Sequence, residues 1–252
     1  MFKAYIENKK AVFFDLDGTV VKTYPLLEQA FAKVLKEIDA EWVYLPTVRE
    51  EGEPIIETWH KILRIETIKT KFTAKELTEH LHNEYLKIIK KSELNPTPGF
   101  WSLAYELKVE KGFKLALVTN SNRVITTAVL NQMGINQTFD FIICGDEVKN
   151  KKPDPEMFLT AAKQVGASHK EVLVFEDSLI GAVAATKARM STIIIWDGET
   201  DQRLYPKDIL AFLPDFTMLP ENLDKTHIEA FQDAIKPHIE KRQKKITQQT
   251  TA

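Results

Sequence analysis

The chain has 252 residues, and its 34 basic and 36 acidic side chains leave a formal net charge of −2 at pH 7. Hydrophobic residues at 44% and charged residues at 28% are typical of a folded globular protein and exclude a disordered or fibrous one. Because there is no excess of positive charge, nucleic acid is not expected as a partner.

No membrane partner is expected either. The longest run of hydrophobic residues, Ile209–Leu213, is far shorter than the ~20 residues of a membrane-spanning helix. The first ten residues mix charged and apolar side chains and do not resemble a signal peptide. Cys144 is the only cysteine, which excludes an internal disulfide and a multi-cysteine zinc site. We therefore expect a cytoplasmic protein that is a monomer or a weak dimer.

The first predicted element is a short buried strand, Ala11–Phe14, which leads directly into Asp15-Leu16-Asp17-Gly18-Thr19. Two carboxylates at this spacing could begin a calcium-binding EF-hand loop, which needs Gly at its sixth position and Glu at its twelfth. Those positions hold Val20 and Leu26, so the calcium loop is excluded. Taken alone, the pentapeptide could still be an ordinary Asp-Gly turn.

From residue 21 to residue 94, apolar residues recur at helical spacing. The apolar stripes run over Phe31–Ile38, Ile55–Leu63 and Leu77–Ile89. They predict a small all-helical domain, residues 21–94, inserted into a core of residues 1–20 and 95–235, with hinges at Lys22–Pro25 and Asn95–Gly99. Alternatively, these helices pack directly on the sheet. Residues 236–252 are expected to form a polar, solvated C-terminal tail.

Further strands and helices alternate along the rest of the chain. The predicted strands are Leu115–Val118, Phe141–Cys144, Val172–Phe175 and Ile193–Trp196, and the predicted helices are Arg123–Met133, Asp154–Val165 and Leu179–Arg189. The strands lack a polar–apolar alternation, which indicates that both of their faces are covered. The predicted fold class is therefore α/β, with a doubly wound parallel sheet.

Polar groups follow three of these strands. Thr119-Asn120-Ser121-Asn122 precedes a helix, where backbone N–H groups can hold an anion or the side chains can simply cap the helix. Lys151-Lys152-Pro153 and Glu176-Asp177 follow the next two strands. Ligands of such sheets bind beyond the carboxyl ends of the strands, so we expect these groups to converge with Asp15 and Asp17. The acids could bind a metal ion, and the lysine and the N–H groups could bind an anion. A Mg²⁺ ion beside a phosphate would therefore explain all of these groups together, because buried acids need a cation nearby.

The order of these polar motifs along the chain resembles that of the haloacid dehalogenase superfamily. The resemblance is to the branch of the superfamily that has a helical cap inserted after the first motif. The resemblance rests on DLDGT at 15–19, Thr119 after LALV, Lys152 in KKPDP, and VFEDS at 174–178. It extends from residue 11 to about residue 220 and implies a Rossmann-like core with a small helical cap domain.

The resemblance also implies a role for each motif residue. Asp15 would be the nucleophile that forms an aspartyl phosphate, and Asp17 would be the general acid and base. The phosphate would be bound by Thr119, Asn120 and Lys152. The ligands of Mg²⁺ would be Asp15, Asp17 through its backbone carbonyl, Glu176 and Asp177. The cation has a physical purpose, because a carboxylate and a phosphate dianion ~4 Å apart repel by on the order of 4 kcal/mol per charge pair.

Within the family, Asp17 favours phosphoryl transfer, because the dehalogenases lack this acid. The expected function is a Mg²⁺-dependent phosphatase acting on a small phosphorylated metabolite. One alternative is a mutase similar to the β-phosphoglucomutases, but those carry Val where Thr19 stands and a His near Leu27. The other alternative is a non-catalytic binding protein on the same fold, although no motif acid is missing.

The substrate is expected to be selected by the helical region. The segment Arg49–Pro54 looks like the loop that such caps present to the substrate, and Arg49 could either pair with an anionic group or be solvated. His60, His80 and His82 are expected on the surface. A sugar phosphate, a nucleotide and phosphoglycolate all fit these expectations.

Overall fold

The computed structural model describes residues 2–40, 48–65, 68–220 and 225–235 of the chain. A six-stranded sheet forms its centre, with the order β3-β2-β1-β4-β5-β6 and all strand pairs parallel. The strands are β1 (Ala11–Phe14), β2 (Lys114–Thr119), β3 (Phe141–Cys144), β4 (Val172–Glu176), β5 (Ser191–Ile195) and β6 (Ile209–Leu213). The predicted fold class, a doubly wound α/β sheet, is confirmed.

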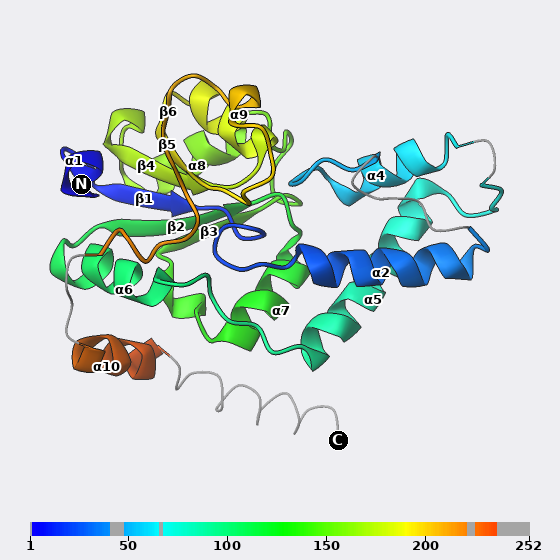
Figure 1. Ribbon diagram of the computed structural model, residues 1–252, viewed down its shortest axis with the longest axis horizontal. Helices are drawn as coiled ribbons and strands as arrows, with labels where there is room; N and C mark the ends of the chain where they lie inside the picture. Colours follow the sequence, from blue (N-terminus) through cyan, green and yellow to red (C-terminus); the bar gives the residue numbers. More distant parts are fainter. Residues whose placement is uncertain (1, 41–47, 66–67, 221–224, 236–252) are drawn as a thin grey trace.

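Helices cover both faces of the sheet (Figure 1). Those of the core are α1 (Phe2–Ile6), α6 (Phe100–Tyr105), α7 (Arg123–Met133), α8 (Glu156–Val165), α9 (Leu179–Lys187) and α10 (Lys225–Ile235), and α6 continues into a π-helical segment, Glu106–Glu110. Short 3₁₀ turns lie at Asn136–Thr138, His169–Glu171 and Gln202–Leu204. Helices α6 and α7 contribute to the apolar cluster on one face, and α8 and α9 to the cluster on the other.

Strand β1 shows why the strands carry no polar–apolar alternation. Val12 and Phe14 pack into the cluster with α6 and α7, whereas Ala11 and Phe13 pack into the cluster with α8 and α9. Successive side chains point to opposite faces of a strand, and here both faces are covered. All four residues are fully buried.

The helical region lies to one side of the sheet (Figure 1) and contains α2 (Tyr24–Glu37), α4 (Ile55–Ile62) and α5 (Ala74–Lys91). Its own contacts include Phe31 against Trp59, with ring centroids 5.1 Å apart. Its apolar residues are continuous with the cluster on one face of the sheet, and α5 packs against α7. The division at residues 21 and 94 into a separate cap domain remains a prediction.

One of the two predicted hinges is held by the core. Thr97 is 3% exposed, its N–H donates to the carbonyl of Val20 at 2.7 Å, and its hydroxyl donates to the carbonyl of Thr19 at 2.7 Å. At Gly99, with φ of 81°, an added Cβ would lie 2.5 Å from the backbone of Phe216. The returning linker is therefore anchored at Thr97, so any hinge motion has to occur before that residue.

Several elements were not predicted. Strand β6 lies at the edge of the sheet, its register against β5 shifts between Thr192 and Ile193, and its residues are partly exposed, Leu210 by 43%. It coincides with the apolar run Ile209–Leu213, which the sequence reasoning did not assign to a strand. Helices α1, α6 and α10 were also missed, and the predicted tail at 236–252 lies outside the described residues.

In the described ranges no helix is both long and apolar enough to cross a membrane.

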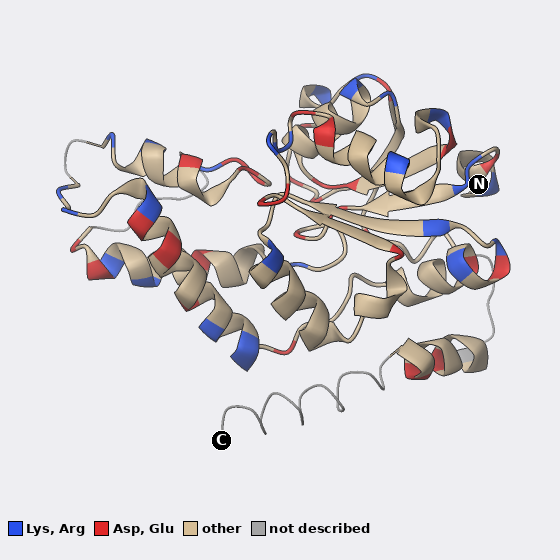
Figure 2. Cartoon of the chain, turned by 180° about the vertical axis from the view of Figure 1, so that it is seen from behind, with Lys and Arg blue, Asp and Glu red and all other residues tan. Residues whose placement is uncertain are grey.

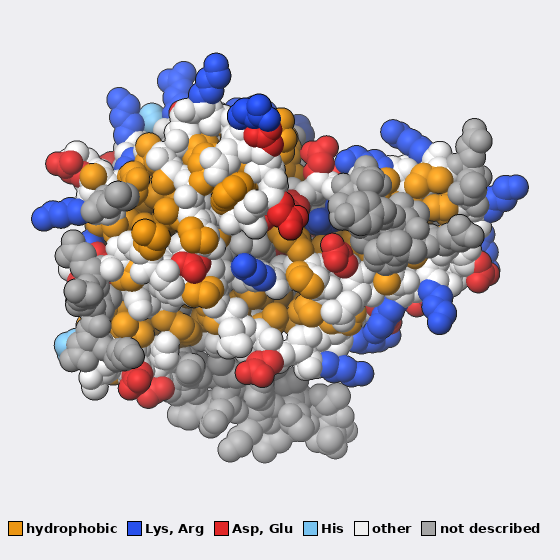
Figure 3. All heavy atoms as spheres, viewed as in Figure 1, with side chains coloured by type: hydrophobic (Ala, Val, Ile, Leu, Met, Phe, Trp, Pro, Cys, Tyr) orange, Lys and Arg blue, Asp and Glu red, His pale blue; other side chains and the backbone are white. Residues whose placement is uncertain are grey.

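Acidic residues gather where the sheet meets the helical region, whereas basic and acidic side chains are mixed over one face of the molecule. Figure 3 shows basic and acidic side chains interspersed with apolar ones over the face seen in Figure 1. Figure 2 shows acidic segments gathered where the sheet meets the helical region. These segments follow the carboxyl ends of the strands.

Candidate active site

The turn after β1 places Asp15 and Asp17 at the edge of the sheet. The N–H of Asp15 still donates to the carbonyl of Phe175 in β4, and the N–H of Gly18 donates to the carbonyl of Val21 at 2.8 Å. Gly18 has a φ of +87°, and a Cβ there would lie 2.0 Å from Asp177 Oδ2. Only glycine fits this conformation and this close approach without displacement.

Lys152 is the central cation of the site. It is 3% exposed, and its Nζ donates to Asp15 Oδ1, Glu176 Oε1 and the carbonyl of Val118, each at 2.6 Å. These three acceptors use the three donors of an ammonium group. Lys152 therefore joins the ends of β1, β2 and β4.

The two acids at the end of β4, Glu176 and Asp177, have different partners. Glu176 is fully buried, and its Oε2 accepts from the N–H groups of Asp177 and Ser178 and from the Ser178 hydroxyl. Asp177 is 7% exposed and accepts from Thr19 at 2.9 Å and from the Tyr24 hydroxyl at 2.8 Å. In the described structure, Glu176 thus supports Lys152, and its role as a metal ligand remains a prediction.

Asp17 faces the base of the helical region. Its Oδ1 accepts from the Thr23 hydroxyl at 2.5 Å, and its Oδ2 accepts from the Ser121 hydroxyl at 2.6 Å. Thr23 is the residue before α2, and Ser121 follows β2. These contacts fix the carboxylate between the sheet and the helices.

Thr119 and Asn120, predicted to bind phosphate, lie at the end of β2. Thr119 is 1% exposed and its hydroxyl accepts from the N–H of Ser121. The Asn120 side chain donates to the carbonyl of Gly52 at 2.8 Å, and its Oδ1 accepts from the N–H of Lys152 at 3.0 Å. Asn120 thus connects the core with the loop of the helical region, and phosphate binding by both residues remains a prediction.

Burial makes Asp15 and Asp177 hard to ionise without a further cation. It raises the pKa of Asp15 to about 8, and Lys152 opposes this shift without overcoming it. Burial also raises the pKa of Asp177, with Glu176 and Asp15 acting in the same direction. The pKa of Lys152 is lowered by burial but raised by more through Asp15 and Glu176, so it is raised overall. An added positive charge beside Asp15 and Asp177 would favour their charged forms.

The residues present fit a hard divalent cation. Asp15 and Asp177 are both buried, and the backbone at Gly18 passes directly against the Asp177 carboxylate. This donor set consists of oxygen atoms, which Mg²⁺ prefers. No group of three or more His, Cys, Asp or Glu side chains in the described ranges is already arranged as a metal site. A cation here would therefore rely on backbone, substrate or water oxygens as well.

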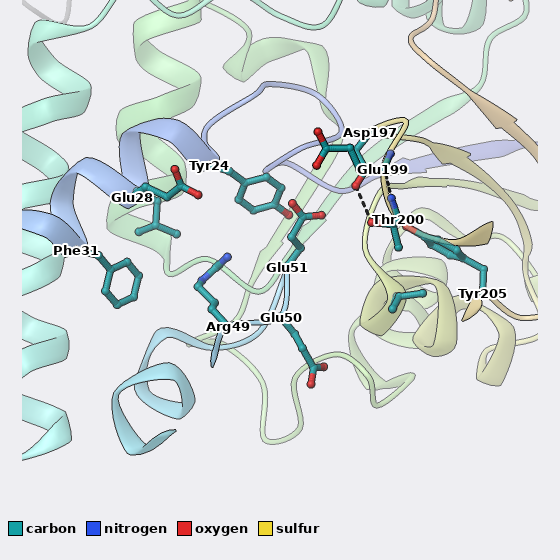
Figure 4. A pocket seen from close by; sticks show the side chains of 12 residues that line it. Tyr24, Glu28, Phe31, Arg49, Glu50, Glu51, Asp197, Glu199, Thr200 and Tyr205 are labelled. Atoms are coloured by element: carbon teal, nitrogen blue, oxygen red, sulfur yellow. Dashed lines mark hydrogen bonds between the residues drawn. The ribbon is translucent and has the colours of Figure 1, made fainter. Parts of the chain in front are cut away.

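A cavity of about 240 Å³ opens beside these residues, between the sheet edge and the helices. Its wall contains Asp15, Asp17, Thr119 and Lys152 together with residues of the helical region. A second pocket of about 470 Å³ adjoins it and shares Tyr24 and Arg49 with it (Figure 4). The second pocket is also lined by the acids Glu28, Glu50, Glu51, Asp197 and Glu199.

Arg49 and His82 differ from the simplest expectation of solvated side chains. The Arg49 guanidinium lies 5.6 Å from the centroid of the Tyr24 ring, and its Nε is buried with no hydrogen-bond partner among the residues that the structure describes. His82, expected on the surface, is instead partly buried in the cavity wall, with Nδ1 3.2 Å from the amide of Asn122. That expectation was wrong, because α5 turns this face toward α7.

Sequence reasoning missed Thr23, Tyr24 and Ser121 as partners of the acids. Thr23 and Tyr24 lie where α2 begins, and Ser121 lies within the predicted polar group after β2. Their hydroxyls meet carboxylates that are 6, 153 and 104 residues away. The sequence did show hydroxyl side chains in the predicted hinge, Thr23 and Tyr24, and after the predicted strand, Ser121, and these could have been proposed as donors to the acids.

A parallel sheet whose strand ends bring together Asp15, Lys152 and Asp177 is the arrangement expected of a haloacid dehalogenase-like hydrolase. Residues 12–195 match this family, and the chain belongs to it. The predicted family is confirmed.

Individual relatives agree with this membership. A haloacid dehalogenase-like hydrolase domain-containing protein of Arabidopsis thaliana is 40% identical over 136 residues, which are 53% of this chain but only 42% of that protein. The phosphorylated carbohydrates phosphatase of Thermotoga maritima is 29% identical over 190 residues, 73% of this chain and 83% of that protein. The crystal structure of CbbY from Rhodobacter sphaeroides in complex with phosphate has the same fold, with a TM-score of 0.74 at 23% identity, covering 84% of this chain and 96% of that one.

Proposed function

We propose that this protein is a Mg²⁺-dependent phosphatase that hydrolyses a small phosphorylated metabolite through an aspartyl-phosphate intermediate. The observation that carries the proposal is the 2.6 Å contact between Lys152 and Asp15 at the wall of a cavity that also contains Asp17. A nucleophile, a cation and a second acid meet there. This combination suits a phosphate dianion whose alcohol needs a proton when it leaves.

Each chemical step uses residues of this chain. In the first step, a carboxylate oxygen of Asp15 attacks phosphorus, the bond to the alcohol oxygen breaks, and Asp17 gives that oxygen its proton. In the second step, Asp17 takes a proton from water as the water oxygen attacks phosphorus, which releases Asp15 and inorganic phosphate. Lys152 would exchange one of its three present acceptors for a phosphate oxygen, and with the backbone N–H groups after Thr119 it would hold the phosphate throughout.

The metal ion would be held by Asp15, by Asp177 and by the backbone carbonyl of Asp17, with Glu176 as a further predicted ligand. When bound, Mg²⁺ reduces the repulsion between the attacking carboxylate and the phosphate. The raised pKa values of Asp15 and Asp177 support a cation at this position.

The named relatives favour a small phosphorylated carbohydrate. The similar protein of Thermotoga maritima is named a phosphorylated carbohydrates phosphatase. We also propose a cytoplasmic monomer or weak dimer; the single cysteine, Cys144, excludes an internal disulfide and agrees with a reducing compartment.

A phosphosugar mutase is the second candidate. Against it, Leu27 lines the cavity near the position where such mutases, by resemblance, carry a histidine. An apolar side chain cannot exchange protons with a sugar hydroxyl. Assaying sugar-phosphate isomerisation beside phosphate release in one preparation distinguishes the two activities.

The proposal is tested with Asp15→Asn. Turnover of a panel of phosphorylated metabolites should require Mg²⁺ in the natural protein and fall to background in the variant, with no phosphoenzyme trapped by acid quench. Circular dichroism checks that the variant folds. Substantial turnover by a folded Asp15→Asn protein would contradict the covalent mechanism, and no turnover by the natural protein would favour a binding protein.

A further inference from the structure

Tyr85 carries a buried hydroxyl that forms no well-aligned hydrogen bond with any described residue. The residue is 2% exposed and lies on α5, in the wall of the cavity that contains Asp15 and Asp17. Its Oη lies near the Thr23 hydroxyl, but that hydroxyl donates to Asp17, and no partner of good geometry is found within the described ranges. A buried polar group without such a partner is costly, and a ligand that accepts a hydrogen bond from it would explain it.

The neighbouring polar side chains of α5 do have partners. Thr78 donates to the carbonyl of Ala74 at 2.8 Å, and His82 lies 3.2 Å from the amide of Asn122. Thr78, His82 and Tyr85 follow one another along the face of α5 that borders the cavity. Of these three, Tyr85 is the one whose side chain has no well-aligned hydrogen bond to a described residue.

The position of Tyr85 indicates which part of a substrate it would meet. Phosphate would be held from the sheet side by Lys152 and the end of β2, as the proposed function requires. Tyr85 comes from the helical side of the cavity, and its hydroxyl lies near Thr23, the residue that donates to Asp17, and close enough to Asp17 for the negative charge of that carboxylate to affect it. Asp17 is the proposed proton donor to the leaving alcohol, so Tyr85 lies on the side of the alcohol.

The hydroxyl is also available as a neutral donor. Burial raises the pKa of Tyr85 above its ordinary value, and Asp17 adds to this effect. The group therefore keeps its proton under ordinary conditions. A neutral O–H suits an uncharged alcohol or carbonyl oxygen, whereas phosphate attracts the cation Lys152 more strongly.

We propose that Tyr85 is a specificity-determining residue whose hydroxyl donates a hydrogen bond to an oxygen on the alcohol part of the substrate, next to the ester. The enzyme would then select monoesters of polyhydroxylated alcohols over those of apolar alcohols. This inference rests on the proposed phosphatase function for its assignment of the two ends of the substrate.

The test compares glycerol 1-phosphate with n-propyl phosphate, which differ only in two hydroxyl groups. The selectivity ratio, kcat/KM for the first ester divided by that for the second, is measured in the natural protein, in Tyr85→Phe and in Tyr105→Phe. Tyr105 lies on α6 against α10, outside the cavity wall, and is the matched control. We expect Tyr85→Phe to lower the ratio by about tenfold or more, with propyl phosphate changed by less than about threefold, and Tyr105→Phe to leave it unchanged.

The same ratio is measured for binding, by calorimetry on proteins that also carry Asp15→Asn. An equal loss for both esters would show that Tyr85 only positions Asp17 or the helix, and an unchanged ratio would show that its hydroxyl meets no substrate oxygen. Either result overturns the inference while the phosphatase stands. If the natural protein has no turnover but its binding ratio falls in Tyr85→Phe, the proposed function fails and the role of Tyr85 in recognition remains.

Discussion

At the scale of single residues, the site depends on how hydrogen-bond donors are divided among its carboxylates. Asp17 receives two hydroxyl donors, from Thr23 and Ser121, whereas Asp15 receives the ammonium group of Lys152. A hydroxyl orients a carboxylate without neutralising it, and an ammonium group does both. This division suits an acid and base at Asp17 and a nucleophile beside a phosphate-binding cation at Asp15.

The role of Asp17 can be separated from a structural one by the leaving group. In Asp17→Asn, phosphorylation of the enzyme by alkyl phosphates should slow by about 10²–10⁴-fold, because their leaving oxygen needs a proton. Phosphorylation by activated aryl phosphates should slow little, whereas release of phosphate from the enzyme should slow for both. Single-turnover measurements with the two substrate types give these rates.

Ser121→Ala is the control for this prediction, because it removes one donor to Asp17 but keeps the acid. It should have a smaller effect, and one that does not depend on the leaving group. If Asp17→Asn slows the first step equally for both substrates, Asp17 positions the site and is not the acid.

At the scale of elements, the loop before α4 is docked on the sheet edge. The carbonyl of Gly52 accepts from Asn120, and a Cβ at Gly52 would lie 2.9 Å from the hydroxyl of Ser178. Gly52 has a φ of +75°, so the loop combines a left-handed residue with a close approach. The helical region therefore closes the cavity through a backbone contact that tolerates no side chain.

Gly52→Ala should accordingly hold the loop away from the core and lower kcat/KM by about tenfold or more, since a displacement near 1 Å can cost about 10²-fold. Gly112→Ala is the matched control, because Gly112 has a φ of +67° but nothing within 4 Å of an added Cβ. Both variants should lose about 1–2 kcal/mol of stability from backbone strain, read from denaturation curves. Equal kcat/KM in the two variants would mean that docking of the loop does not matter for turnover.

At the scale of the whole molecule, the buried acids link folding stability to pH and to the cation. The pKa of Asp15 is raised from 3.8 to about 8 by burial in the native protein. Between these values the native state holds a proton that the unfolded state has lost. The free energy of unfolding of the metal-free protein should therefore fall as pH rises from about 4 to about 8.

Urea denaturation in the presence of a chelator, at intervals across this range, measures the effect. Asp15→Asn should be less dependent on pH than the natural protein and more stable than it near the upper end. Added Mg²⁺ should stabilise the natural protein there and the variant less. A pH dependence identical in the two proteins would show that Asp15 carries no such penalty.

The sequence by itself determined the sheet and the position of the chemistry. Apolar runs as short as Ala11–Phe14 predicted five of the six strands, and Arg123–Met133 was predicted to the residue because Asn122 and Gly134 cap it. Each motif group comes after one of those strands, with Lys152 in the connection from β3 to α8, and parallel strands end at one edge. Local order along the chain was therefore enough to bring Asp15, Thr119, Lys152 and Asp177 to one place.

Only the tertiary structure decided how those residues are partnered. That Tyr24 donates to Asp177 and that His82 and Tyr85 enter the cavity depend on how α2 and α5 sit against the sheet. That Glu176 supports Lys152 depends on how the segment between β3 and α8 meets the end of β4. Helical periodicity shows which face of a helix is apolar, but not which polar side chains at its border meet a second element. Those contacts join residues from 24 to 153 positions apart, and they form only when the elements pack, because packing decides which donors lose water and must find another partner.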